Sequence, residues 1–340
     1  MQYFRTLILL LLLLSPLSAT DYNKNPEVQS FIERMSKKYH YKKSYLQMIF
    51  KSVRKESYCP PCPKKNTLPN EKNTQKISKK QGSWDKYAHC HIGDNHTNMG
   101  VKFMEEHQKN LKKVYEQYGV PPEYITAIIG IESYYGNNNG HYYVFDRLTH
   151  LAFGNDNRRK FYQYELQEFL RMCYREQIEP RRVKGSHSGA IGLAQFLPSN
   201  YQKFAVDFNK DGKVRMSNHA DAIASIGNYF NKNGWKKNTP VAVRASYKGN
   251  RFNGLRTGTP YKYQRRNLKN ITPKEPFNYK DDVMLIKLAR ANHDELWYGA
   301  KNFYVITRYN HSSYYAMAVH QLAQKIKKAY GKGYRKNFKL

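Results

Sequence analysis

One carboxylate stands at the end of an apolar run in the sequence IIGIESYYG, residues 128–136. Glu132 follows Ile125, Ile128 and Ile129 at helical spacing, so a helix would place all four side chains on one face. Burial on such a face makes the carboxylate harder to ionise and raises its pKa. A carboxyl that keeps its proton near neutral pH can act as a general acid in glycoside cleavage. The alternative is a glutamate that ends the helix, reaches solvent or pairs with an arginine.

A second stretch with the chemistry of a binding site is KGSHSGAIGLAQFLPSNY, residues 184–201. Its glycines, serines and alanine leave room for a ligand or a second backbone to approach closely. Ser186 and Gln195 add neutral hydrogen-bonding groups of the kind that a sugar binder needs. The alternative is a tight contact between two helices.

A third stretch is ITRYNHSSYYAMAVHQLAQ, residues 306–324, which precedes and enters an amphipathic helical pattern. Tyr309, Asn310, His311 and Tyr315 combine aromatic rings with hydrogen-bonding groups, which fits a cleft for a glycan. The alternative is that the tyrosines are core residues with one satisfied hydroxyl.

The segment DFNKDGKVRMSNHAD, which begins at Asp207, starts like an EF-hand loop. Asp207, Asn209 and Asp211 supply side-chain oxygens at positions 1, 3 and 5, and Lys213 offers its carbonyl at position 7. Position 12 is Asn218 instead of the usual bidentate glutamate, and nearby lysines and an arginine weaken the local field for a cation. The alternative is a turn rich in Asp and Asn without a metal.

The four cysteines leave three interpretations open. Cys59 and Cys62 have C-x-x-C spacing, and Cys90 and Cys173 follow later. A disulfide ranks first, and a zinc site formed with His89 and Cys90 ranks second. Redox catalysis ranks last, because the strand–helix context of a redox motif is missing. The sequence does not determine the pairing.

The first 19 residues, MQYFRTLILLLLLLSPLSA, predict a secretory signal peptide. Arg5 provides the positive start, Leu7 to Leu14 form the apolar region, and small residues end it. The segment is too short for an ordinary membrane span, although an uncleaved anchor is the alternative. No cysteine follows at once, so we expect a periplasmic protein without a lipid anchor or stable membrane insertion.

The formal net charge is +32, from 58 Lys and Arg against 26 Asp and Glu. The electrostatic field of so positive a chain favours acidic partners: nucleic acid, an anionic membrane or an acidic wall polymer. Export argues against nucleic acid as the partner. The alternative is a generally basic, solvated surface.

The elements that must position these groups are mostly helical. The chain has 340 residues, 40% of them hydrophobic, which is enough for a substantial core. Apolar spacing predicts two short helices between residues 28 and 53, and further helices over 99–119, 162–176, 220–233, 284–291 and 315–330. One short strand is expected at 303–307. Residues 58–82 form a polar linker, and 237–283 form a loop-rich region with room for a small sheet.

Six stretches, taken in order, resemble the lytic murein transglycosylase B family, which is exported and cleaves peptidoglycan. They are YGVPPEYITAIIGIES, DRLTHLAF, RRKFYQYELQEFL, KGSHSGAIGLAQFLPSNYQKFAVDFNKDGKV, IGNYFNKNGW and NFYVITRYNHSSYYAMAVHQLAQ. The resemblance implies a mostly α, lysozyme-like core with an EF-hand-like loop and a small loop-rich β subregion. We expect a signal at 1–19, a helical segment and linker at 20–84, the transglycosylase domain at 85–330 and a basic tail at 331–340.

The resemblance implies that Glu132 is a single catalytic acid. Glu132 would protonate the β-1,4 glycosidic oxygen between N-acetylmuramic acid and N-acetylglucosamine, then accept the proton of the muramoyl C6 hydroxyl, giving a 1,6-anhydro product. Asp146, Asp156 and Glu165 are nearby acids without a comparable apolar setting. A hydrolytic muramidase and a non-catalytic peptidoglycan-binding protein are the alternatives.

The same resemblance implies the remaining site residues. Five positions match glycan-binding residues of the family: Ser186, Gln195, Tyr229, Tyr309 and Tyr315. Arg158 and Arg159 match an arginine pair near the cleft, after a one-residue insertion, and would pair with substrate carboxylates. Asp221 matches a late ligand of a structural Ca²⁺, and the chemistry needs no cofactor. The expected partner is a peptidoglycan glycan strand, bound by a monomer.

Overall fold

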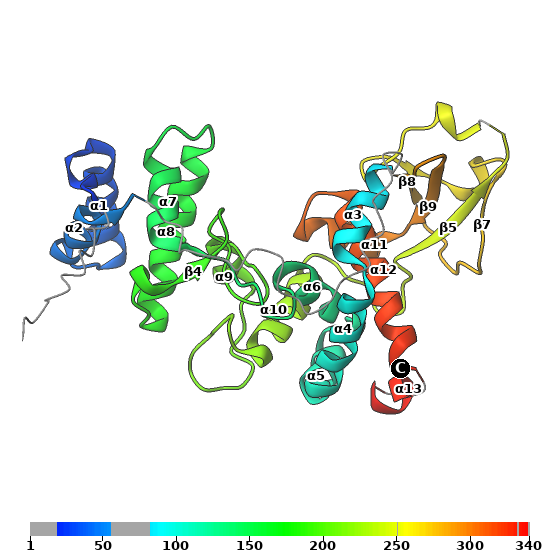
Figure 1. Cartoon of the computed structure of the whole chain (residues 1–340), viewed down its shortest axis with the longest axis horizontal. Coiled ribbons are helices and arrows are strands. Elements are labelled where there is room, and N and C mark those ends of the chain that lie inside the picture. The colour runs from blue at the N-terminus through cyan, green and yellow to red at the C-terminus, as the bar shows by residue number, and fades with distance from the viewer. Residues whose placement is uncertain (1–18, 56–81, 250, 332, 339–340) are drawn as a thin grey trace, which may run out of the picture.

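Helices build most of the fold in the part of the chain that the computed structural model describes, residues 19–55, 82–249, 251–331 and 333–338 (Figure 1). The predicted signal peptide before Ala19 and the predicted linker up to residue 81 lie outside these residues. The helices are α1 Pro26–Tyr39, α2 Lys43–Lys51, α3 Ser83–His91, α4 Asp94–Glu106, α5 Gln108–Tyr118, α6 Pro122–Ser133, α7 Val144–Phe153, α8 Arg159–Glu176, α9 Pro198–Phe204, α10 His219–Lys232, α11 Lys301–Tyr309, α12 Ser313–Tyr330 and α13 Gly333–Phe338.

Helix α6, which carries Glu132, lies near the middle of the molecule (Figure 1). Pro122 occupies its first turn, where the missing amide hydrogen costs nothing. Helices α4, α5, α10 and α12 pack around it, so most of its residues are buried on every side. The predicted apolar face is therefore part of a helix that is apolar nearly all round, as expected of a central helix.

The sheet lies at the end of the molecule beyond α11 and α12 (Figure 1). Its strand order is β6-β8-β9-β5-β7, and each neighbouring pair is antiparallel. Its strands are β5 Ala242–Tyr247, β6 Lys262–Tyr263, β7 Ile271–Pro273, β8 Val283–Ala289 and β9 Asp294–Gly299. The small sheet expected in the loop-rich region is confirmed, and it extends past that region to residue 299.

The helix predicted over Met284–Ala291 is wrong, because this segment is strand β8. Successive side chains of a strand point to opposite faces. Leu285 packs in the apolar cluster of the sheet, while Met284 and Ile286 join the cluster that holds the helices. A strand buried on both faces gives an uninterrupted apolar run, which periodicity alone does not separate from a short helix.

The strand predicted at Phe303–Thr307 is also wrong, because these residues lie in α11. The β-branched residues suggested a strand, but tertiary contacts decide the conformation. The Asn302 side chain accepts a hydrogen bond from the amide of Lys236 and donates to the carbonyls of Lys236 and Thr239, which fixes the start of the helix.

The single helix predicted over Met99–Gly119 is two helices, α4 and α5, which meet at His107. The His107 ring packs on Phe103 and stacks on His219, with ring centroids 4.4 Å apart in each pair. This contact with the start of α10 turns the chain at a point where the sequence has neither glycine nor proline. The helices predicted over 162–176, 220–233 and 315–330 are confirmed as parts of α8, α10 and α12.

The two short N-terminal helices are confirmed as α1 and α2, which lie beside α7 and α8 at the end of the molecule away from the sheet (Figure 1). Their apolar residues belong to the same cluster as the central helices. Two small strand pairs tie separate segments together. They are β1 Ala19–Thr20 with β2 Val53–Arg54, and β3 Tyr142–Tyr143 with β4 Lys184–Gly185. The expected tail contains α13, whose Tyr334 and Phe338 are buried.

Candidate active site

Glu132 is half-buried in the last turn of α6, and its side chain meets α12. The Tyr315 hydroxyl donates a hydrogen bond to Glu132 Oε1 at 2.7 Å. Burial raises the pKa of Glu132 from 4.5 to about 7, and the Tyr315 bond opposes part of that rise. No carboxylate or cation among the described residues contributes to this shift. The carboxyl can therefore hold its proton near neutral pH.

Aromatic hydroxyls surround the carboxyl. The rings of Tyr309 and Tyr315 are nearly parallel, 11° apart with centroids separated by 6.4 Å. Burial, and then the charge of Glu132, raise the pKa of both phenols and also that of Tyr87 on α3. Tyr87 was missed in the sequence, because no helix was predicted over 83–91 and no spacing links this residue to Glu132.

The chain turns sharply after α6. Tyr134, Tyr135 and Gly136 are consecutive left-handed residues, with φ of 49°, 57° and 90°. A run of such conformations stores strain and is typical of functional sites. The turn sends the chain toward the end of β4, where a Cβ on Gly140 would lie 2.0 Å from the carbonyl carbon of Gly185. Only a glycine permits this approach, which joins the glutamate segment to the glycine-rich segment.

Gln195 and Ser186 hold the glycine-rich segment in place. The Gln195 side-chain nitrogen donates to the carbonyls of Gly192 at 2.8 Å and Asn139 at 3.2 Å, and its backbone is left-handed with φ of 45°. The Ser186 hydroxyl accepts hydrogen bonds from the amides of Ser188 and Ala190. Both residues are partly exposed, so they retain access to a ligand.

Tyr309 connects this segment to α11. Its hydroxyl donates to the carbonyl of Ala194, and its ring meets Tyr229 edge to face at 4.9 Å. Tyr229 is buried, with its own hydroxyl bonded to the carbonyl of Arg308. Four predicted residues, Gln195, Tyr229, Tyr309 and Tyr315, are thus linked to Glu132 or to the segments around it.

The structure does not bring Arg158 and Arg159 into contact with Glu132. Arg159 pairs with Glu27 of α1, and Arg158 bonds to the hydroxyl of Tyr162 within the first turns of α8. Both arginines line a hollow beside α1.

The other nearby acids are occupied by structural contacts. Asp146 is fully buried and pairs with Arg54 at 2.6 Å. Glu165 is buried and accepts hydrogen bonds from the amide and hydroxyl of Ser199. Asp156 accepts from the amide of Arg158. Among these carboxylates, only Glu132 is bonded to a phenol in an apolar setting.

The EF-hand-like loop gathers the expected oxygens on one turn. Asp207 accepts from the amides of Asp211 and Gly212, and the Asn209 amide group donates to Asp211. Asp221 is buried at the start of α10, where it accepts from two loop amides. Carboxylate and amide oxygens are the ligand type of a hard cation. In this structure the Asp207 and Asp221 oxygens accept from backbone amides, Arg215 pairs with Asp211 at 2.7 Å, and the three carboxylates do not converge on one metal position.

The structure describes two of the four cysteines. Cys59 and Cys62 lie outside the described residues. Cys90 is exposed, Cys173 is buried, and neither forms a disulfide in the described part of the chain. Across those residues no group of three or more His, Cys, Asp or Glu side chains is arranged to hold a metal.

The chain is similar to proteins of one family over most of its length. The family described as Transglycosylase SLT domain matches residues 23–324. Membrane-bound lytic murein transglycosylase B of Escherichia coli K12 is 36% identical over 312 residues, which cover 90% of this chain and 84% of that protein. The structure of Escherichia coli lytic transglycosylase Slt35 in complex with calcium matches with a TM-score of 0.81, at 35% identity over 92% of this chain and 96% of that chain.

A more distant structure is SltB3 of Pseudomonas aeruginosa in complex with NAG-NAM-pentapeptide. It matches with a TM-score of 0.66 and 26% identity, over 72% of this chain and 67% of that chain.

By fold and site, the protein is an enzyme that cleaves a glycan. The chain belongs to the lytic murein transglycosylase B family, and it is a lytic transglycosylase of peptidoglycan. In the residues that the structure describes, no helix has the length and apolarity needed to cross a membrane.

Proposed function

We propose that Glu132 is the single acid and base of this transglycosylase. Its carboxyl donates a proton to the β-1,4 glycosidic oxygen between N-acetylmuramic acid and N-acetylglucosamine as the bond from that oxygen to muramoyl C1 breaks. The muramoyl C6 hydroxyl then attacks C1 and gives its proton to the Glu132 carboxylate. The product is a 1,6-anhydromuramoyl end, no water is consumed, and the carboxyl regains its proton.

The observation that carries this proposal is the isolation of Glu132. Glycosidases that use water or a covalent intermediate ordinarily place two carboxylates about 5–10 Å apart across the bond. Here burial raises the pKa of the Glu132 carboxyl to about 7. The Asp146 carboxylate pairs with Arg54, and the Glu165 carboxylate accepts a hydrogen bond from the Ser199 hydroxyl. An acid with a pKa near the working pH can both give and take a proton.

We propose that Ser186, Gln195, Tyr309 and Tyr315 contact the glycan around the scissile bond, with Tyr229 holding Tyr309 in position. The partly exposed Ser186 and Gln195 offer hydrogen bonds to sugar hydroxyl or acetamido groups. Arg158 and Arg159 remain candidates for substrate carboxylates only if the strand extends to the start of α8, beside α1.

The direct test is the Glu132→Gln variant, which keeps the size of the side chain but cannot transfer the proton. We expect cleavage of peptidoglycan to fall at least about hundredfold, the scale of general acid–base catalysis. Binding to insoluble peptidoglycan should survive. Glu105→Gln, an exposed carboxylate on α4, is the control. A folded Glu132→Gln protein that still cleaves would overturn the assignment.

We propose that the loop from Asp207 to Asp221 holds a structural Ca²⁺. The oxygens of Asp207, Asn209 and Asp211, with the Lys213 carbonyl, match the first half of a calcium loop, and a relative's structure was determined in complex with calcium. Loops of this kind in exported modules bind with a Kd of about 10⁻⁴–10⁻³ M.

Calcium at about 5 mM should raise the Tm of the wild type by a few degrees, through mass action on the native state. Asp207→Asn should lose this response, and the Glu105→Gln control should keep it. No shift in the wild type at that concentration would contradict the proposal.

We propose that the enzyme is exported to the periplasm, that residues 1–19 are removed as a signal, and that it works as a monomer on glycan strands. The basic charge supports attraction to an anionic wall. The proposal also divides the mature chain into a helical segment and linker at 20–84, a transglycosylase domain at 85–330 and a basic tail at 331–340. A mass measurement on the mature protein would test the cleavage site.

A further inference from the structure

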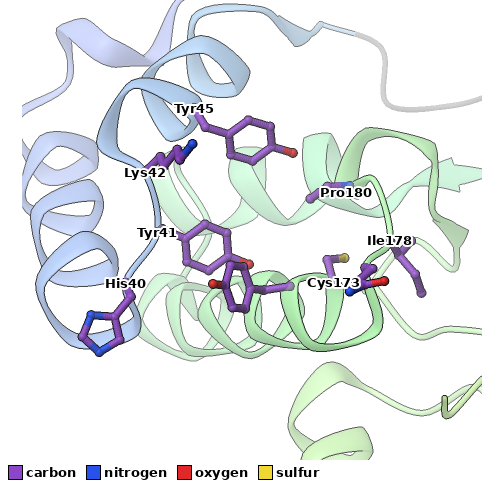
Figure 2. Close-up of a pocket in the computed structure, with 9 residues that line it drawn as sticks. His40, Tyr41, Lys42, Tyr45, Cys173, Ile178 and Pro180 are labelled. Carbon is purple, nitrogen blue, oxygen red and sulfur yellow. The ribbon is translucent and has the colours of Figure 1, made fainter. Parts of the chain in front are cut away.

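A cavity of about 430 Å³ lies between the α1–α2 junction and the C-terminal end of α8 (Figure 2). This volume is typical of sites for small ligands. The lining residues are His40, Tyr41, Lys42, Tyr45, Cys173, Tyr174, Gln177, Ile178 and Pro180. None of these residues contributes to the Glu132 site, and none takes part in the proposed chemistry.

Aromatic rings form the walls. Tyr41 is buried and anchored through its hydroxyl to the carbonyl of Leu170, and its ring meets Tyr174 at 5.1 Å and 53°. Tyr174 is 61% exposed and lines the cavity, so its ring is available to a ligand there. Within the described residues, every exposed large hydrophobic side chain lies on α2 or α8, and Tyr174 is one of them.

Polar groups stand at the rim. His40 and Gln177 cap α1 and α8 in the left-handed conformation, with φ of 58° and 55°, although neither is a glycine. A left-handed residue is a common end for a helix, and here it places His40 and Gln177 among the residues that line the cavity. Lys42 is exposed and has no ion pair within the described part of the chain, so its charge is available to a ligand.

We propose that this cavity is a second, non-catalytic site that binds one muramoyl residue of a glycan strand. The proposal rests on peptidoglycan being the partner. The rings of Tyr41 and Tyr174 can face the C–H surface of the sugar and its acetyl methyl group. In a muramoyl residue without a stem peptide the lactyl carboxylate is free, and Lys42 can pair with it, while Gln177 can hydrogen-bond to hydroxyl or acetamido groups. The chemistry selected is an acidic amino sugar.

The position of the cavity suggests what the second site does. It lies in the region of α1, α2 and α8, whereas Glu132 lies on α6 toward the middle of the molecule (Figure 1). A glycan strand held at the cavity raises the effective concentration of its other glycosidic bonds at the Glu132 site. The site would therefore keep the enzyme on the wall between cleavage events, without changing the chemical step.

The test compares Tyr174→Ala with Tyr164→Ala, a control on the same helix whose 45% exposed ring does not line the cavity. Both changes are made in the full chain with Glu132→Gln, and binding is measured to insoluble glycan from which an amidase has removed the stem peptides. We expect Tyr174→Ala to weaken binding about three- to tenfold and Tyr164→Ala to leave it unchanged. Lys42→Gln should weaken binding similarly, unlike Lys51→Gln at the other end of α2.

The same substitutions are then placed in the active enzyme. Tyr174→Ala should slow the cleavage of long glycan strands without stem peptides but leave kcat/KM for a soluble tetrasaccharide unchanged. Equal binding by the Tyr174→Ala and Tyr164→Ala proteins would overturn the second site, as would competition for the cavity by free stem peptide alone. If the wild type released no product from either substrate, the catalytic proposal would fail instead.

Discussion

Proton exchange at Glu132 depends on a balance between burial and one hydrogen bond. Burial raises the pKa of this carboxyl to about 7, while the Tyr315 hydroxyl stabilises the ionised form. The first chemical step needs the protonated form. The rate of cleavage should therefore fall as pH rises through about 7, since the acid is progressively lost.

Tyr315→Phe removes the bond that favours the carboxylate. The pKa of Glu132 should rise further, so the basic limb of the kcat/KM profile should move to higher pH, even if kcat itself falls. A pH series on a soluble glycan measures this, with Tyr164→Phe on the surface of α8 as the control. A basic limb that moved to lower pH would contradict the role given to Tyr315.

The same ionisation links Glu132 to stability. Its pKa is about 7 in the folded protein and near 4.5 in an unfolded chain, so the native state binds the proton more tightly. This contribution to stability is fully present below about pH 4.5 and is lost as pH rises toward and through 7. Glu132→Gln, which is always neutral, should therefore gain stability over the wild type above pH 7. Thermal melting at pH 4 and pH 8 tests this, and the same Tm difference at both would argue against it.

At this scale the sequence predicted the acid but not its whole environment. The spacing of Ile125, Ile128, Ile129 and Glu132 was sufficient to suggest a buried carboxyl. Tyr87 could not be found in this way, because it approaches Glu132 through the packing of α3 and not through any local pattern. Arg158 and Arg159 match the family's arginine pair in sequence, but this match does not predict which surface of the protein they line.

At the scale of elements, the active site depends on two segments whose backbones come into close contact. Gly140 has φ of 95°, and a Cβ there would collide with the backbone of Gly185. Gly140→Ala should lower the free energy of unfolding by about 1–3 kcal/mol and reduce cleavage, because the glycine-rich segment is displaced from Glu132. Denaturant unfolding and a peptidoglycan assay measure both effects.

The matched control is Gly254→Ala, at a position with no atom within 4 Å of the added Cβ. Its unfolding free energy should stay within about 0.5 kcal/mol of the wild type. If the two variants were equally stable and active, the close contact at Gly140 would not hold the site together.

Sequence patterns predicted the amphipathic helices α8, α10 and α12 better than the short buried elements. Strand β8 is apolar on both faces, and α11 is rich in β-branched residues, so local pattern favoured the wrong element in each. Long-range contacts decide the conformation of these two segments. The local sequence does not show which residues they contact. The error at β8 did not affect the predicted acid, because β8 pairs with β6 and β9 in the sheet whereas Glu132 lies on α6.

At the scale of the whole molecule, the charge of +32 should hold the enzyme near an anionic wall. Raising the salt from about 0.1 M to about 1 M shortens the Debye length from about 10 Å to about 3 Å. Turnover of sacculi should fall accordingly, while turnover of a short neutral chito-oligosaccharide, if cleaved, should change little. If salt slowed the turnover of both substrates equally, the effect of charge would lie within the enzyme, and attraction to the wall would not explain it.

The most direct test of the catalytic account is the mass of the ends released from purified peptidoglycan. The account predicts 1,6-anhydromuramoyl ends, lighter than reducing ends by one water, from the wild-type enzyme and none from Glu132→Gln. Mass spectrometry of the digest distinguishes the two kinds of end. Reducing muramoyl ends as the main product would contradict the central claim, because they would require water where the account has only the C6 hydroxyl and Glu132.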